Sequence, residues 1–317
     1  MFLGTYKNGN YDVVIFQDGT KIRASNDENF IPTRIESLDC KITNFCDMGC
    51  KFCHEQSTPD GEHADLSNPV IDTFPPFTEV AIGGGNPLSH PDLEKFLARL
   101  RTQDCIPNIT VNQTHFLQEY DRLKRLTQEE LIYGLGVSVF NPNEELAHKL
   151  SEFPNAVVHT IAGITTVDTL AKMRDLGIKK ILLLGYKNYG RGEQYYNENV
   201  AKNIDELRAR LKEIKGWFKV VSFDNLAIEQ LNVKSIMDEE EWEQFYMGND
   251  GCYTMYVDLV KKQYAKSSTS KDRFELLPTI NDMFLNIRDK TINNNENKEV
   301  EQEQISFENI EGNKLEE

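Results

Sequence analysis

The stretch "SLDCKITNFCDMGCKFCHEQ" (residues 37–56) joins a short apolar run, 37–43, to three of the six cysteines of the chain. A short run of this kind is typical of a strand buried in a sheet. Cys46, Cys50 and Cys53 follow it directly, so the thiols are expected in the loop after the strand. In a barrel of parallel strands, such loops carry the chemistry. The stretch therefore predicts where the main fold begins and where its functional site lies.

Six further apolar runs follow, and between them the apolar residues recur with helical spacing. Segments 93–100 and 200–214 fit helices, and Thr127 with Glu130 predicts a helix start. Strands that alternate with helices imply parallel pairing and right-handed crossovers. The sequence therefore predicts an α/β fold, a partial (β/α)6 barrel of the TIM type. The six runs are 79–83, 108–112, 134–140, 157–163, 180–186 and 218–223.

The chain is expected to divide into four parts. Asp18-Gly19 lies between β-branched and apolar residues and predicts a hairpin near the N-terminus. A second hairpin is expected around Asn249–Gly251. The expected parts are an N-terminal β unit (1–35), the barrel core (36–235), a C-terminal helix and hairpin extension (236–290) and a disordered acidic tail (291–317).

Composition limits the partners and the compartment. The 317 residues carry a formal net charge of −16, which argues against binding to extended nucleic acid. No apolar run approaches the length of a membrane-spanning helix. The first residues, "MFLGTYKNGN", lack the pattern of a secretory signal. We therefore expect a cytoplasmic protein whose clustered thiols stay reduced and serve metal binding or catalysis.

Three kinds of metal site compete for the thiols. Structural zinc wants four ligands, and His54 adjoins Cys53 and is a poor fourth one. "CKFCH" (50–54) matches the attachment pattern of c-type haem, but this leaves Cys46 without a role. Thiolates are also the usual ligands of iron–sulfur clusters. Three of them would leave one iron of a [4Fe–4S] cluster open for chemistry, whereas an electron carrier would gain from a fourth cysteine.

The spacing C-x3-C-x-Φ-C, with Phe52 at the aromatic position, resembles the signature of the radical S-adenosylmethionine (SAM) enzymes, CxxxCxxC type. The resemblance implies one [4Fe–4S] cluster on Cys46, Cys50 and Cys53, and SAM bound at the fourth iron. It also implies a 5′-deoxyadenosyl radical that abstracts hydrogen from a substrate, and a reductant such as flavodoxin or ferredoxin. A redox sensor or electron carrier is the alternative that is not an enzyme.

The segment "AIGGGNPLSHPDLEKFL" (81–97) is similar to the family's Gly-Gly-Glu-Pro region. The resemblance places Gly84, Gly85 and Asn86 beside SAM, where glycine lets the backbone approach the methionine moiety. Asn86 replaces the usual Glu, which keeps an acceptor oxygen for the ammonium group but loses the charge.

Three weaker similarities extend the expected cofactor site. Asn112 in "ITVNQTHF" (109–116) resembles the family's third-strand segment. Ser138 resembles the fourth-strand residue that faces the ribose. "LLLGYKNYGRG" (182–192) resembles a segment that lies along the adenine.

The substrate is less well specified. The segment 238–268 loosely resembles the SPASM or twitch extension of peptide-modifying relatives, with its cysteines lost. We therefore expect a peptide or protein side chain as the substrate, with a nucleotide or other small molecule as the alternative. No catalytic residue is assigned, although His54, Glu55 and His63 follow the thiols as acid–base candidates. Cys40, Cys105 and Cys252 are too scattered to predict a second cluster.

Overall fold

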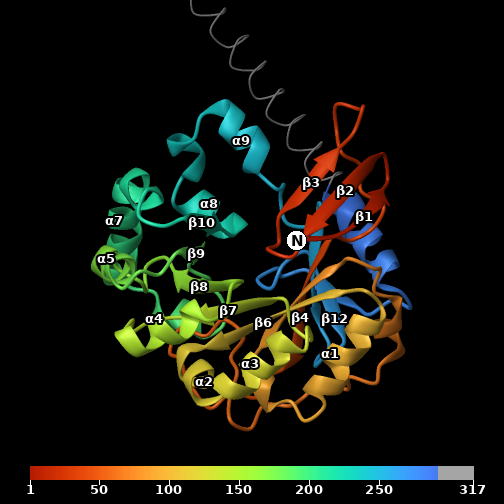
Figure 1. Cartoon of the computed structure of the whole chain (residues 1–317), viewed down its shortest axis with the longest axis horizontal. Coiled ribbons are helices and arrows are strands. Elements are labelled where there is room, and N and C mark those ends of the chain that lie inside the picture. The colour runs from red at the N-terminus through yellow and green to blue at the C-terminus, as the bar shows by residue number, and fades with distance from the viewer. Residues whose placement is uncertain (292–317) are drawn as a thin grey trace, which may run out of the picture.

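The computed structural model describes residues 1–291, and its main feature is a ten-stranded curved sheet (Figure 1). The order is β10-β9-β8-β7-β6-β5-β4-β11-β12-β13, in which β10 through β11 run parallel. The α/β prediction of a partial TIM-type barrel is confirmed. The seven apolar runs correspond to β4 (Ser37–Thr43), β5 (Glu79–Gly84), β6 (Ile106–Asn112), β7 (Gly134–Ser138), β8 (Ala156–Ile161), β9 (Lys180–Leu184) and β10 (Val220–Phe223).

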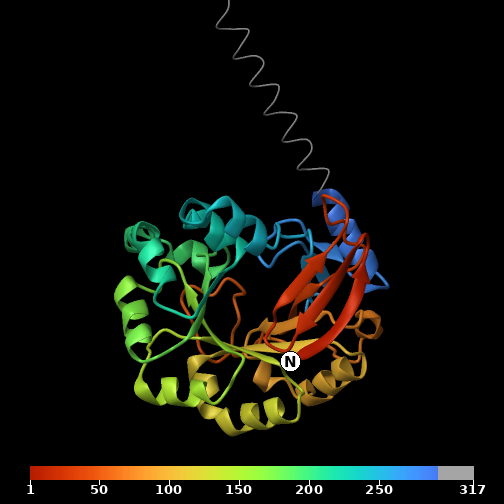
Figure 2. The same ribbon diagram turned by 45° about the horizontal axis from the view of Figure 1, so that its top comes forward.

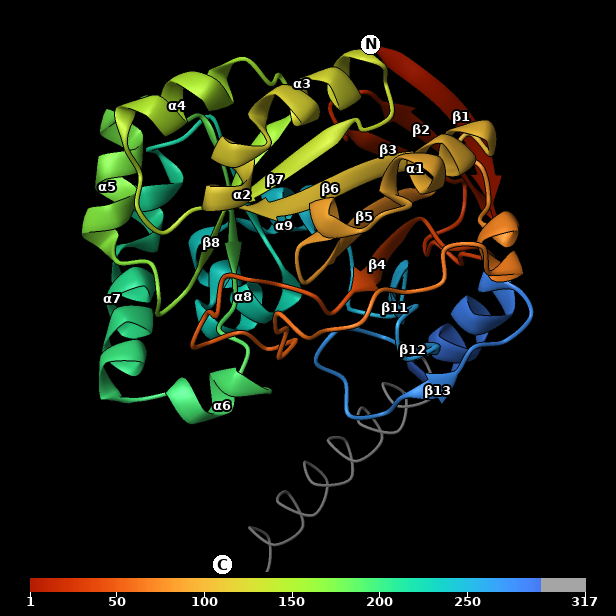
Figure 3. The same cartoon turned by 90° about the horizontal axis from the view of Figure 1, so that it is seen from below.

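Helices cover the outer face of this sheet (Figures 1 and 3). Their apolar stripes and the outward residues of the strands form one core, and none of the helices in residues 1–291 is long and apolar enough to cross a membrane. The α-helices are α1 (Leu93–Thr102), α2 (Gln113–Gln118), α3 (Tyr120–Gln128), α4 (Glu144–Ser151), α5 (Val167–Asp175), α6 (Arg191–Tyr195), α7 (Glu198–Lys215), α8 (Asn225–Gln230) and α9 (Glu239–Phe245). The short 3-10 helices are η1 (Pro69–Thr73), η2 (Pro87–Ser89) and η3 (Val233–Ile236).

Several barrel strands have an apolar outer face and polar side chains on the inner face. On β4, Leu38 and Cys40 are buried among the outer helices, and Asp39 between them is accessible on the inner face. The same alternation exposes Thr110 on β6 and His159 on β8 in part. Because side chains alternate with a period of two, Asp39, Thr110 and His159 all lie on the inner face.

The N-terminal residues form a three-stranded antiparallel sheet of β1 (Phe2–Asn8), β2 (Tyr11–Phe16) and β3 (Lys21–Ala24). Figure 2 shows it as the red strands across one end of the barrel. The expected Asp18-Gly19 hairpin is present between β2 and β3, with Gly19 at φ 85°. The sheet contacts the amino ends of the barrel strands, where Lys21 pairs with Glu79 on β5 at 2.6 Å.

A buried carboxylate fastens this sheet to the barrel. Glu36, immediately before β4, accepts hydrogen bonds from Tyr11 at 2.5 Å and from Arg23 at 2.9 Å. Burial works to raise the pKa of Glu36, but the hydrogen bonds of Arg23 and the charges of Lys21 and Arg23 outweigh it and lower that pKa. The carboxylate therefore stays ionised inside the interface.

The C-terminal part departs from the predicted arrangement. Residues 249–251 form a turn instead of a hairpin. The chain then enters β11 (Thr254–Asp258), which pairs in parallel with β4, and the hairpin lies between β11 and β12 (Gln263–Ala265). β13 (Phe274–Glu275) ends the sheet, and residues 280–291 are helical. The acidic tail was predicted to begin at residue 291, and this residue is helical. The rest of the predicted tail, 292–317, lies outside the described residues.

Candidate metal and cofactor site

The three neighbouring thiols lie in the loop that follows β4, and all three are half-buried. Burial raises the pKa of Cys46 and Cys50, and the charge of Cys53 raises both further. The thiols therefore lie close enough to repel one another as thiolates. Gly49 takes φ 60°, a conformation that favours glycine, so that the loop turns between Cys46 and Cys50.

The loop crosses the carboxyl ends of the barrel strands and is held on both sides. On the β5 side, Asn86 N donates to Phe45 O at 2.6 Å. On the β6 side, His115 of α2 contacts Asp47 of the loop, with His115 Nε2 and Asp47 Oδ1 2.7 Å apart. His115 was not singled out from the sequence, because no local pattern connects it to residue 47.

Arg191, the first residue of α6, clamps the other side of the loop. Its guanidinium donates from Nε to Cys50 O at 3.1 Å and from Nη2 to Ser57 O at 3.0 Å, and its backbone N donates to Cys53 O at 3.2 Å. The charge of Arg191 also acts to lower the pKa of Cys50. The segment expected along the adenine thus fixes the backbone of the thiol loop.

Gly84 and Gly85 are required by the packing of β5 against this loop. A Cβ on Gly84 would lie 2.3 Å from Thr43 O, and one on Gly85 would lie 2.1 Å from Phe45 O. Gly84 also takes φ 109°. The structure shows this close approach toward the chain itself, and contact of Gly84 and Gly85 with SAM stays a prediction.

Asn86 and Asn112 both cap helices. Asn86 is buried, and its Oδ1 accepts from Leu88 N at 3.2 Å at the start of η2. Asn112 Oδ1 accepts from Thr114 N at 2.8 Å at the start of α2. In both side chains the helix cap uses the oxygen Oδ1, and the amide nitrogen Nδ2 takes no part in it. Contact of Asn86 or Asn112 with SAM stays a prediction.

Phe52 lies at the edge of a small cavity beside the thiols. Its ring packs edge-on against Tyr195, with the centroids 5.8 Å apart. The cavity holds about 60 Å³ and has an apolar wall from neighbouring strands, Ile161 of β8 and Leu184 of β9. An apolar slot next to the loop is suited to a flat, uncharged group.

Strand register brings Asn112 and Ser138 together and adds a third polar residue. Asn112 on β6 pairs with Ser138 on β7, which pairs with His159 on β8. A Cβ at Gly136 would lie 2.4 Å from the His159 ring, so the glycine leaves room for the imidazole. Burial lowers the pKa of His159 to about 4, which keeps the imidazole neutral near pH 7. Alternation of side chains along the predicted strand 157–163 would have placed His159 on the inner face.

Asp39 on the inner face of β4 has other acidic side chains nearby. Asp39 is accessible yet surrounded by protein, and burial raises its pKa to about 6. Lys187 acts to lower that pKa, while Asp250 and Asp224 raise it further. The interior is therefore polar and suited to a hydrogen-bonding substrate.

The donor set bears on the metal alternatives. Within residues 1–291, no group of three or more His, Cys, Asp or Glu side chains is arranged to hold a single metal ion. Structural zinc takes four ligands, whereas this loop supplies three thiols. Thiolates are the usual ligands of iron–sulfur clusters, so the chemistry of the donor set is that of a cluster. Metal binding would also displace the protons of the thiols.

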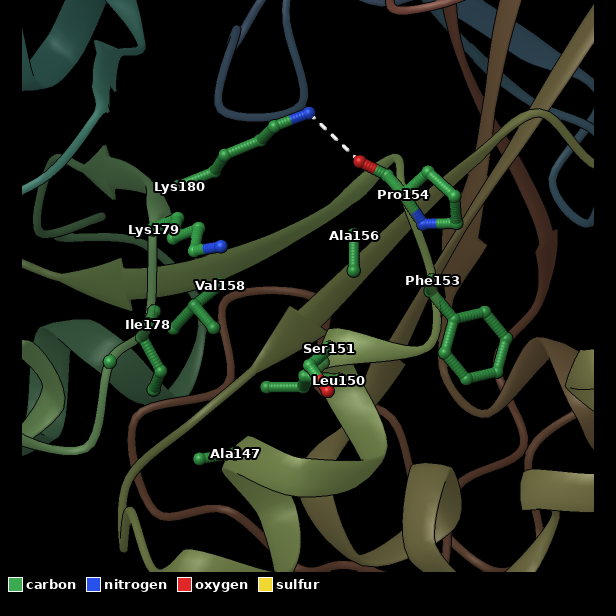
Figure 4. A pocket seen from close by; sticks show the side chains of 11 residues that line it. Ala147, Leu150, Ser151, Phe153, Pro154, Ala156, Val158, Ile178, Lys179 and Lys180 are labelled. Carbon is green, nitrogen blue, oxygen red and sulfur yellow. Dashed lines mark hydrogen bonds between the residues drawn. The ribbon is translucent and has the colours of Figure 1, made fainter.

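A larger cavity lies away from the thiols and belongs to the opposite end of the strands (Figure 4). It holds about 200 Å³ between the end of α4 and the start of β9. Its wall includes Leu150, Phe153 and Ile178, and Lys180 donates to Pro154 O at 2.9 Å at its rim. None of the predicted site residues lines it.

Comparison with known proteins gives one family. The family model described as the Radical SAM superfamily matches residues 40–193. No curated protein matches the sequence.

SuiB and coproporphyrinogen III oxidase are two of the solved structures similar to this chain. SuiB from Streptococcus suis, bound to precursor peptide SuiA, has 14% sequence identity and a TM-score of 0.52, over 74% of this chain and 60% of that chain. Coproporphyrinogen III oxidase (HemN) from Escherichia coli has 16% identity and a TM-score of 0.44, over 73% of this chain and 66% of that one. This chain thus spans 60% of the SuiB chain, and at this identity the likeness to SuiB shows a shared fold.

Proposed function

Residues 40–193 match the family model of the Radical SAM superfamily, and from this premise we propose that the chain is an enzyme of this family that cleaves SAM reductively at a cluster held by Cys46, Cys50 and Cys53. When bound, a [4Fe–4S] cluster supplies the electron that converts SAM to methionine and a 5′-deoxyadenosyl radical, which takes hydrogen from a substrate. The single observation that carries the proposal is the loop of three half-buried thiols across the carboxyl ends of a parallel barrel.

The residues of the chain have separable roles in this proposal. Arg191 fixes the loop backbone and places a positive charge near the thiolates. Gly84 and Gly85 let β5 approach the loop. Asn112 and Ser138 form a polar row for the ribose and methionine ends of SAM, and the slot beside Phe52 is suited to the adenine.

The substrate we propose is a peptide or protein side chain. The fold is shared with SuiB, whose structure contains a precursor peptide, and the C-terminal segment loosely resembles the extension of peptide-modifying relatives. A reductant such as flavodoxin or ferredoxin would supply the electron. We place the protein in the cytoplasm, where its thiols stay reduced.

Anaerobic reconstitution with iron and sulfide, followed by dithionite and SAM, tests the proposal. The wild-type chain is expected to turn brown and to release 5′-deoxyadenosine and methionine in equal amounts. The Cys50→Ala variant should bind no stable cluster and release neither product, because two thiolates remain. Cys252→Ala is the control and should retain both. A reducible cluster that leaves SAM intact would support an electron carrier instead, and a chain without iron would refute the assignment.

A further inference from the structure

Glu55, two residues after Cys53, connects the thiol loop to a distant part of the chain. Its carboxylate accepts a hydrogen bond from Lys41 Nζ at 2.7 Å and from the hydroxyl of Tyr256 at 3.0 Å. Its side chain is only 13% exposed. Lys41 lies on β4, immediately before the loop, whereas Tyr256 lies on β11, 201 residues after Glu55 in the sequence. The carboxylate therefore fastens the end of the loop to the C-terminal strand.

A second acidic residue of β11 completes the pairing. Asp258 lies 3.5 Å from Lys41 Nζ and is as buried as the lysine. Leu259 N donates to Lys41 O at 3.0 Å, which continues the parallel register of β11 on β4. Figure 3 shows β11 beside β4 at this edge of the sheet.

His54 makes a parallel connection through a second lysine. Lys187, just after β9, lies 3.4 Å from His54 Nε2 and donates to Ser268 Oγ at 2.8 Å. Ser268 follows β12 and is buried. Both residues that follow Cys53 are thus held by the segment 254–268, one directly and one through Lys187.

The charged groups of this contact are paired inside the protein. Lys41 Nζ lies between two carboxylates, 2.7 Å from Glu55 and 3.5 Å from Asp258. His54 Nε2 also lies 3.5 Å from Glu55. Removing one member of a buried pair leaves an uncompensated charge in a medium of low dielectric constant, which is strongly destabilising. Such a network has one preferred arrangement and so fixes the backbone that it joins.

We propose that Glu55 is a positioning residue through which the segment 254–268 fixes the thiol loop in the geometry that binds the cluster. The proposal rests on the proposed function, since it assumes that the loop holds the cluster. Glu55 acts through the backbone of residues 53–55 and does not touch the cofactor in this role. The C-terminal segment thereby contributes to the site without supplying a ligand.

Hydrogen–deuterium exchange on the full chain without a cluster tests this directly. Tyr256→Phe removes one hydrogen bond to a charged group and leaves the ring in place. We expect the amides of residues 46–56 to exchange on the order of tenfold faster in this variant. The matched control is Tyr264→Phe, because the Tyr264 hydroxyl is bonded to Asn286 on the same extension and does not contact the loop.

A spectroscopic measurement on the reconstituted protein distinguishes positioning from general stability. In Tyr256→Phe and Glu55→Gln the electron paramagnetic resonance signal of the reduced cluster should broaden, and the Michaelis constant for SAM should rise more than kcat falls. Glu275→Gln, an exposed change on β13, should alter neither.

Equal exchange at residues 46–56 in Tyr256→Phe and Tyr264→Phe would overturn the proposal, and this result does not depend on iron. A wild-type chain that binds no iron refutes the proposed function instead, so the two failures are distinguishable. If Glu55→Gln fails to fold, Tyr256→Phe still tests the proposal, because this variant leaves every charge of the network in place.

Discussion

Glycine positions beside the thiol loop show how a single residue sets the site. Gly83 and Gly85 are two residues apart at the end of β5, but a Cβ on Gly83 would meet nothing within 4 Å, whereas one on Gly85 would meet Phe45 O at 2.1 Å. We expect Gly85→Ala to lower the free energy of unfolding by about 1–3 kcal/mol, because a backbone carbonyl must move. Gly83→Ala should be neutral or stabilise slightly. Urea unfolding of both variants checks this, and equal stability would contradict it.

The site residues differ in how far the sequence could predict them. Cys46, Cys50 and Cys53 are local, since their spacing alone identifies the loop. Arg191 and His159 come from other strands or helices, and only the register and the crossovers bring them to the loop or to Ser138. Arg191 lies in the segment expected along the adenine, but its contact with the loop is long-range and leaves no pattern in a single sequence. Alternation could have placed His159 on the inner face, whereas its pairing with Ser138 depends on strand register.

At the scale of elements, the strands were predictable and some boundaries were not. Every apolar run became a strand because its outward residues have a helix to pack against. Thr127 and Glu130 were expected to begin a helix, but this was wrong. Thr127 donates to Leu123 O inside α3, and Glu130 takes φ 55° just after that helix ends. The spacing of a capping box also fits the last turn of a helix, so the pattern did not decide between the two ends.

The cap of α2 provides a test that separates stability from binding. Asn112→Asp keeps a capping oxygen but replaces the amide nitrogen. We expect the free energy of unfolding to change by less than about 0.5 kcal/mol, while the affinity for SAM, measured by calorimetry on the reconstituted protein, falls roughly threefold to tenfold. Asn112→Ala, as the comparison, should lose about 1 kcal/mol of stability as well. Unchanged affinity in both variants would show that Asn112 serves the helix alone.

At the scale of the molecule, the N-terminal sheet is fastened through Glu36. Burial and pairing together leave the pKa of Glu36 below its ordinary value. The contact therefore contributes its full stability above about pH 4.5, and this contribution is lost as the pH falls through the lower pKa of the folded state. We expect Glu36→Gln to cost about 3–5 kcal/mol at pH 7, since the buried partner Arg23 is left unpaired. The difference from the wild type should shrink below pH 4.5, as followed by urea unfolding across pH 3–7.

The control for this prediction is an exposed pair. Arg125 and Glu129 are 3.0 Å apart on the surface of the molecule, so Glu129→Gln should cost about 0–1 kcal/mol. An equal loss in Glu36→Gln and Glu129→Gln would show that the buried carboxylate does not hold the sheet to the barrel.

The pairing of β11 with β4 also orders events while the protein is made. The cysteines leave the ribosome early, but Tyr256 and Asp258 follow some two hundred residues later. Contacts so distant along the chain form late, because the intervening segment must be closed first. A nascent chain therefore exposes its thiols before their support exists, and the proposed cluster would be held stably only after β11 has been synthesised.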